Sequence, residues 1–168
     1  MSLHGDLLDQ ADHLAKREPT RPKQASLRRS ISAAYYALFH LLVFEASRLF
    51  VKDERLANSI NRTYGHGDMN EISKAFASGE WPKAFDPVKP IFSVSQELKA
   101  VAQAFVDLQQ ARHDADYNLA KKFTRSETLT RLDQSGKAFE AWDEVRKDDL
   151  ARIYLACFLL WAQWNKRR

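Results

Sequence analysis

The chain has 168 residues, of which 45% are hydrophobic and 29% are charged, and its formal net charge is +4 at pH 7. This length allows one well-buried core without requiring a second, so we predict a single domain over residues 1–168. The single cysteine, Cys157, excludes an internal disulfide framework, and the mild positive charge is compatible with RNA or nucleotide contact.

Apolar residues recur with helical spacing along the first third of the chain. A first helix is predicted over about 3–17, and Pro19 and Pro22 stop it because proline lacks a backbone donor and restricts the residue before it. A second helix, over about 23–51, has the clearest i, i+3, i+4, i+7 pattern. Its apolar stripe comprises Ile31, Ala34, Tyr35, Leu38, Phe39, Leu42, Ala46, Leu49 and Phe50.

Shorter elements are predicted in the middle of the chain. A short helix over about 53–62 precedes a turn at 63–67, which contains His66 between two glycines. Asp68 with Glu71 forms a capping-box pattern and predicts a helix to about residue 77. Residues 78–90 contain three prolines and are predicted to be irregular.

The last third predicts further helices. Ser93 with Gln96 caps a long helix to about 118, and Thr124 with Glu127 opens the next. A final helix over about 148–165 is either separate from that one or continuous with it. Strand signals are nearly absent. We therefore predict an all-α fold, an antiparallel up-and-down bundle of four to five long helices with additional short helices.

Targeting signals are not evident in the chain. The first residues lack the basic and apolar regions of a signal peptide, and the most apolar stretch, 153–164, is much shorter than the roughly 20 residues of a membrane span. These features predict a cytoplasmic protein without a membrane partner.

Polar side chains flank the apolar stripe of the 23–51 helix. Arg29, Ser32, Tyr36 and His40 share one narrow face, and the rings of Tyr36 and His40 stack at i, i+4. Each also has a structural explanation: a tyrosine at the edge of a core packs its ring, and a boundary histidine is satisfied by its neighbours.

A second polar strip lies at the C-terminal end of the long helix predicted to run to about residue 118. Arg112 lies four residues beyond the core residue Leu108, and Asp116 lies one turn further, where it can pair with Arg112. The neighbouring His113 and Asp114 point away toward solvent. If the two helices pack antiparallel, the two polar strips face each other across one groove. A purely structural ion pair is the alternative.

The sequence contains none of the common motifs for phosphate binding, metal binding or nucleophilic catalysis. It has no glycine-rich phosphate loop, no Cys-x-x-Cys, no His-Glu-x-x-His and no Gly-x-Ser-x-Gly. The five histidines are scattered without ligand spacing on one helix face, so we predict neither a metal site nor a cofactor.

Two motifs resemble the HEPN superfamily, the higher eukaryotes and prokaryotes nucleotide-binding domains. They are Ser-Ala-Ala-Tyr-Tyr-Ala-Leu-Phe-His at 32–40 and Arg-His-Asp-Ala-Asp-Tyr-Asn at 112–118. The Gly-His-Gly turn at 65–67 also looks like small stand-alone bacterial members, and the resemblance covers roughly residues 5–145. It implies a helical bundle that forms homodimers, often encoded beside a nucleotidyltransferase in toxin–antitoxin or defence systems.

Active members of this superfamily are metal-independent endoribonucleases with an arginine, a polar residue and a later histidine. By resemblance, Arg112 matches the arginine and His113 the polar residue. The histidine would fall at 117–119, where this chain has Tyr117, Asn118 and Leu119. The expected catalytic histidine is therefore missing.

Three functional hypotheses follow. The first is RNA or nucleotide binding, or partner docking, without cleavage, through Arg112, Asp116, Tyr117, Tyr36, Ser32 and Arg29. The second is a ribonuclease in which His40, across the groove, supplies the histidine beside Arg112, with Tyr36 stacking a base. The third is a structural or protein-interaction bundle.

Overall fold

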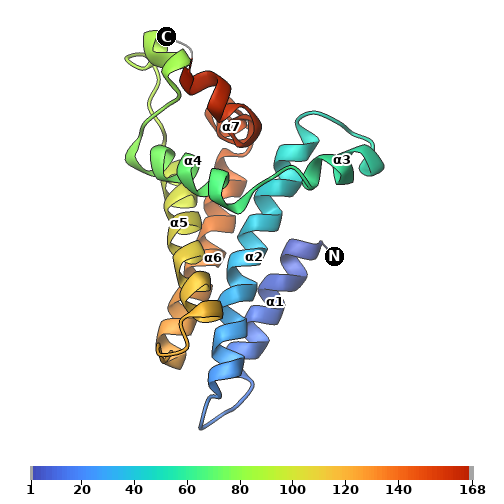
Figure 1. Ribbon diagram of the computed structural model, residues 1–168, viewed down its shortest axis with the longest axis vertical. Helices are drawn as coiled ribbons and strands as arrows, with labels where there is room; N and C mark the ends of the chain where they lie inside the picture. Colours follow the sequence, from blue (N-terminus) through green and yellow to red (C-terminus); the bar gives the residue numbers. More distant parts are fainter. Residues whose placement is uncertain (1, 167–168) are drawn as a thin grey trace. The chain divides into compact units, whose positions relative to one another are not determined.

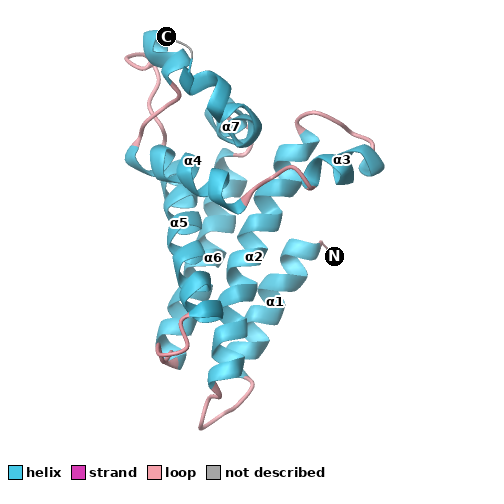
Figure 2. Cartoon of the chain, viewed as in Figure 1, coloured by secondary structure: helices cyan, strands magenta, loops and turns pink. Residues whose placement is uncertain are grey.

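The computed structural model describes residues 2–166 and is built from helices joined by short connections (Figures 1 and 2). Its helices are α1 (Leu3–Lys16), α2 (Gln24–Arg48), α3 (Glu54–Asn61), α4 (His66–Ser78), the 3-10 helix η1 (Lys83–Val88), α5 (Gln96–Tyr117), α6 (Arg125–Val145) and α7 (Asp149–Lys166). No strand occurs within the described residues, which confirms the prediction of an all-α helical bundle.

The chain divides into two compact units. Unit 1 comprises Met1–Leu41 with Ala104–Glu140, and unit 2 comprises Leu42–Gln103 with Ala141–Arg168. The helices α2, α5 and α6 each contribute residues to both units. The predicted single domain over the whole chain stays a prediction, and each unit is described by itself.

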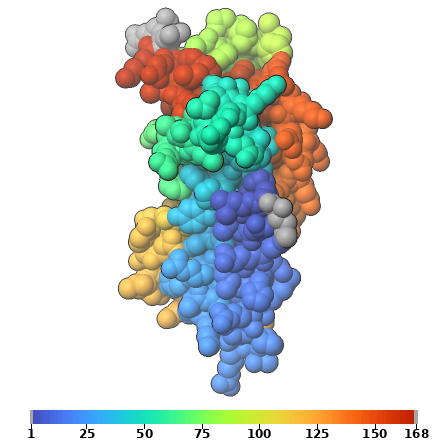
Figure 3. All heavy atoms as spheres, turned by 90° about the vertical axis from the view of Figure 1, so that its right-hand side faces the viewer, coloured from blue at the N-terminus to red at the C-terminus, as the bar shows by residue number. Residues whose placement is uncertain are grey.

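The described residues of unit 1 form α1 and parts of α2, α5 and α6, and successive helices among these run in opposite directions (Figure 1). Small residues let its helices approach closely: Ala11 and Ala34 are fully buried. Ser30 Oγ donates to the carbonyl of Ala11 at 2.7 Å, which joins α2 to α1, and Ser135 Oγ donates to the carbonyl of Ala34 at 3.0 Å, which joins α6 to α2. In Figure 3 the dark blue atoms of α1 lie directly against the lighter blue atoms of α2.

Side-chain caps set the starts of two long helices. The predicted capping box of α6 is confirmed, since Thr124 N donates to Glu127 Oε2 at 2.7 Å and Glu127 N donates to Thr124 Oγ1 at 3.1 Å. The predicted cap of α5 was wrong. Ser95, rather than Ser93, accepts a hydrogen bond from Leu98 N at 3.2 Å, because it stands immediately before the first helical residue.

The start of α4 also differs from the prediction. This helix begins at His66 with Gly65 as its N-cap, so Asp68 lies in the first turn rather than at the cap. A Cβ at Gly65 would stand 3.2 Å from Asp68 Oδ2, so glycine there leaves room for this carboxylate over the helix start, where negative charge is favourable.

Two further boundaries were decided by local backbone geometry. Gly79 ends α4 with φ +83°, and Glu80 N donates to the carbonyl of Ala75 at 2.8 Å, as in a Schellman motif. The helices α6 and α7 are separate, with residues 146–148 between them. The segment 78–90, predicted to be irregular, contains η1.

The core of unit 2 centres on an aromatic cluster between α4 and α7. Tyr154 is fully buried, its ring lies 5.0 Å from that of Phe76 and 4.9 Å from that of Phe158, and its hydroxyl lies 2.8 Å from Ser73 Oγ. Ser73 Oγ already donates to the carbonyl of Met69 at 2.6 Å. Because a serine hydroxyl has one hydrogen, Tyr154 is the donor to Ser73.

This assignment predicts unequal costs for removing the two partners. Ser73→Ala leaves the buried Tyr154 hydroxyl without an acceptor and should lower the free energy of unfolding by about 2 kcal/mol. Tyr154→Phe removes both the donor and its need for a partner, so its cost should be about 1 kcal/mol. Urea unfolding of both variants, with the exposed Ser78→Ala as control, measures the difference. Equal losses for Ser73→Ala and Tyr154→Phe would contradict the assignment.

Candidate functional site

The candidate site lies within unit 1, where α2 and the end of α5 are joined by a chain of polar contacts. Ser32 Oγ donates to Asp116 Oδ1 at 2.6 Å, and Asp116 Oδ2 lies 2.8 Å from Arg112 Nε. Arg112 Nη2 in turn donates to the Tyr36 hydroxyl at 2.9 Å. The structure therefore brings four of the predicted residues together and contains the predicted Arg112–Asp116 pair.

The Arg112 guanidinium is largely covered, with its side chain 21% exposed, and that of Asp116 is 19% exposed. The Nε–Oδ2 contact is an ion pair rather than an aligned hydrogen bond, because Nε is buried and makes no hydrogen bond within the described residues. Burial alone would lower the pKa of Arg112, but Tyr36, Asp116 and Tyr117 outweigh it and raise that pKa above its ordinary value. Arg112 is thus a fixed cation.

Two tyrosine rings flank this cation. Arg112 Cζ lies 5.5 Å from the centre of the Tyr36 ring and 5.3 Å from that of the Tyr117 ring, both within cation–π range. Tyr117 is 61% exposed, and its ring lies 5.2 Å from that of His113. The site thus presents one accessible aromatic ring directly beside a positioned guanidinium.

His40 belongs to the same face of α2 and lies one helical turn beyond Tyr36. It stacks on Tyr36 with ring centres 6.2 Å apart and 29° between the planes, as the i, i+4 spacing predicted. Burial, and then the charge of His4, lower the pKa of His40 below its ordinary value. Tyr36 therefore contacts both the histidine and the guanidinium.

Arg29 is the one predicted site residue that the structure leaves apart. It is exposed on α2 and makes no hydrogen bond or ion pair within residues 2–166. Arg29 lies one turn before Ser32, so its charge is near the Asp116 end of the site without contacting it.

Arg28, which the sequence did not indicate as a site residue, stabilises the end of the helix that carries Arg112 and Asp116. Arg28 Nη1 donates to the carbonyl of Ala115 at 2.6 Å, and its Nη2 donates to the carbonyls of Asn118, at 3.0 Å, and Lys121. It therefore satisfies the Ala115 carbonyl, which lies in the last turn of α5 and has no partner inside the helix, and two carbonyls of the connection that follows. The signal was available in the sequence: no basic residue lies in the last turn of α5, and no glycine follows it.

Asp114 also differs from the expectation that it is solvated. Its Oδ2 lies 2.7 Å from Lys121 Nζ, and its Oδ1 accepts from Gln110 Nε2 at 3.1 Å. The hydrogen bond from Lys121 is the main cause that lowers the pKa of Asp114. The connection after α5 folds back over the helix and brings Lys121 to this carboxylate.

Within residues 2–166, no group of three or more histidine, cysteine, aspartate or glutamate side chains could hold a metal ion. No helix of that part of the chain is long and apolar enough to cross a membrane. Comparison of the chain with family models, curated proteins and solved structures gives no match.

Arg28 and Arg29 provide a matched pair of variants. Arg28→Met should lower the free energy of unfolding by about 2 kcal/mol, because the Ala115 carbonyl of α5 and two carbonyls of the following connection lose a charged donor. Arg29→Met should change it by no more than about 0.5 kcal/mol, since Arg29 is exposed. Denaturant unfolding of both variants tests the role of Arg28, and similar losses in the two would refute it.

The environment of His40 predicts a pH dependence of stability. The pKa of His40 is lowered from 6.5 in the folded protein, so the unfolded chain binds the proton more readily. The stability that neutral His40 contributes is present above pH 6.5 and is lost as the pH falls through the folded pKa. His40→Gln should therefore flatten the fall in unfolding free energy between about pH 7 and 5. The exposed His13→Gln is the control, and an unchanged slope in His40→Gln would oppose this assignment.

Proposed function

We propose that unit 1 binds single-stranded RNA or a nucleotide at the Arg112 site without cleaving it. The observation that carries the proposal is the exposed Tyr117 ring beside a guanidinium that Asp116 and Tyr36 hold in place. Single-stranded nucleic acids are recognised by aromatic side chains that stack on bases and by basic groups that contact the backbone. Tyr117 and Arg112 supply one of each, side by side.

The guanidinium keeps donors for a phosphate. An arginine has five N–H donors, of which one is bonded to Tyr36 and another points near Asp116. The pairing with Asp116 partly neutralises the charge, so Arg112 acts mainly as an oriented donor. The exposed Arg29, together with the net charge of +4, provides the less specific attraction for a phosphate backbone.

Cleavage is less well supported by this geometry. A general base must reach the proton it removes within hydrogen-bonding distance, directly or through one water, and His40 lies one helical turn beyond Tyr36, the residue of α2 that bonds Arg112. Position 117 holds a tyrosine, and a phenol is a poor general base at neutral pH. Asparagine at 118 transfers no protons. The ribonuclease hypothesis that uses Arg112 with His40 therefore ranks second.

The wider biological setting rests on the HEPN resemblance alone. It favours a homodimer in the cytoplasm, acting with a nucleotidyltransferase partner in a toxin–antitoxin or defence system. Co-expression with the product of a neighbouring gene, followed by size-exclusion chromatography, tests this association. A chain that elutes as a monomer with and without that product would count against it.

A purely structural role is the remaining candidate, and the contacts between helices favour it directly. Ser32, Asp116, Arg112 and Tyr36 connect α2 to α5, and such a chain stabilises a bundle whatever the protein binds. The two roles differ in what Tyr117 does, because its exposed ring contributes little to the fold.

Fluorescence anisotropy with a labelled single-stranded RNA separates these roles. Wild-type protein should bind it saturably, with an affinity that falls as salt is raised. Tyr117→Ala should weaken binding about tenfold through the loss of stacking, with the unfolding midpoint unchanged. Arg112→Lys keeps the charge but loses the planar donor set, and should also weaken binding.

The control is Leu119→Ala, which removes an apolar side chain that is 82% exposed two residues from Tyr117. It should bind like the wild type. Salt-insensitive binding, or equal affinities for Tyr117→Ala and Leu119→Ala, would reject the proposal. RNA recovered cut in the absence of metal, but intact with His40→Ala and Arg112→Ala, would instead establish the ribonuclease hypothesis.

A further inference from the structure

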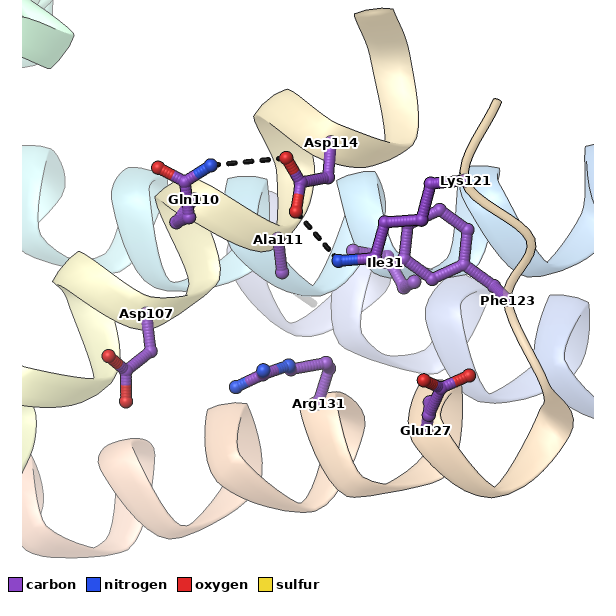
Figure 4. A pocket seen from close by; sticks show the side chains of 9 residues that line it. All are labelled: Ile31, Asp107, Gln110, Ala111, Asp114, Lys121, Phe123, Glu127 and Arg131. Carbon is purple, nitrogen blue, oxygen red and sulfur yellow. Dashed lines mark hydrogen bonds and ion pairs between the residues drawn. The ribbon is translucent and has the colours of Figure 1, made fainter. Parts of the chain in front are cut away.

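A second site lies on the other side of α5, where a small cavity opens within unit 1 (Figure 4). Its volume is about 160 Å³, which is comparable to a cavity of about 150 Å³ that accommodates benzene. The residues that line it are Ile31, Asp107, Gln110, Ala111, Asp114, Lys121, Phe123, Glu127 and Arg131. Position 112 is turned about 160–200° around α5 from 110 and 114, so this cavity is separate from the Arg112 site.

The floor of the cavity is apolar and its walls are charged. Ile31, Ala111 and Phe123 belong to one buried cluster and form the apolar part of the lining. The charged lining residues are three carboxylates and two cations, so the formal charge is −1 and a simple anion is not favoured. A ligand that carries both signs of charge suits these walls better.

The two carboxylates on α5 are bonded to neighbouring side chains. Asp107 Oδ2 accepts from Gln134 Nε2 at 2.8 Å, and Asp114 binds Lys121 and Gln110. Figure 4 shows the Asp114 interactions as dashed lines across the upper wall. The positive charge of Lys121 is thereby paired inside the site and is less available to a ligand.

The lower wall, formed by α6, retains both hydrogen-bond donors and a hydrogen-bond acceptor that a ligand could use. Arg131 Nη1 donates to Gln134 Oε1 at 3.0 Å, and its guanidinium forms no ion pair in the described part of the chain. Glu127 accepts both Thr124 hydrogen bonds through Oε2, so Oε1 remains available. In Figure 4 Arg131 extends into the space between Asp107 and Glu127.

We propose that this cavity binds a small zwitterion of the α-amino acid class with an apolar side chain. The ligand carboxylate pairs with the Arg131 guanidinium, whose planar donors match a carboxylate. The ligand ammonium is held by Glu127 Oε1 on the same helix, and the side chain lies on the floor formed by Ile31, Ala111 and Phe123. This site is independent of RNA or nucleotide binding at Arg112.

L-Valine and its two half-ligands test the proposal. Isovalerate lacks the ammonium and isobutylamine lacks the carboxylate, while both keep the branched apolar group. Titration is followed by the NMR shifts of the Ala111 and Phe123 backbone amides. Valine should shift both amides saturably and bind about tenfold more tightly than either half-ligand, because it gains one more charged hydrogen bond.

Variants of Glu127 and Arg131 test which residue binds the ligand ammonium and which binds the ligand carboxylate. Glu127→Gln keeps the capping box, since glutamine also serves at that position. It should lower the affinity for valine and for isobutylamine about tenfold and leave the affinity for isovalerate unchanged. Arg131→Gln should lower the affinity for valine and for isovalerate by a similar factor. Arg131→Lys should lower both affinities less. Lys137→Gln, on an exposed residue of α6 paired with Asp133, is the control and should have no effect.

Each remaining outcome overturns the proposal. Isovalerate that binds as tightly as valine would identify a plain anion site. Valine that shifts neither amide, or that binds both variants like the wild type, would show that the cavity holds only solvent.

Discussion

The pairing of Arg112 with Asp116 is the interaction on which the candidate site depends. Both side chains are about four-fifths covered, and a charge that is removed from water must find a partner or it destabilises the fold by several kcal/mol. The partners come from α2, since Ser32 bonds Asp116 and the Tyr36 hydroxyl bonds Arg112. The guanidinium is therefore fixed by groups on two helices, and its orientation follows from the packing of unit 1.

The same constraint explains the surroundings of that pair. The Ala115 carbonyl in the last turn of α5 lacks a partner inside the helix, and Arg28 supplies charged donors to it and to the Asn118 carbonyl just beyond the helix. Lys121, in the connection that follows, pairs with Asp114. Most of the polar groups near the end of α5 are thus bound to other parts of unit 1, whereas the Tyr117 ring is left exposed. This contrast between fixed charges and one accessible ring is the basis of the proposed binding role.

The two faces of α5 differ in how their charges are balanced. On the Arg112 face the cation and the carboxylate are in contact, so a ligand gains mainly from oriented donors and an aromatic ring. On the cavity face, Arg131 and Glu127 Oε1 remain available to a ligand that brings complementary charges. The two faces of α5 therefore border two different sites, because successive side chains around a helix face different neighbours.

The sequence by itself determined the helical elements, the capping box of α6 and the i, i+4 relation of Arg112 to Asp116. These features depend on residues close together in the chain, whose geometry within a helix is fixed by its period. The start of α5 was placed wrongly because Ser93 and Ser95 both resemble caps, and only the position of the first turn distinguishes them.

The contacts between helices were decided by the tertiary structure. Arg28 reaches carbonyls some 90 residues away, and Lys121 reaches Asp114 only because the connection folds back over α5. Likewise, the sequence placed Tyr36 and His40 on one face, but only the packing of α2 against α5 brought the Tyr36 hydroxyl to Arg112. Helical periodicity fixes which residues share a face, whereas the rotation and offset of packed helices fix which faces meet.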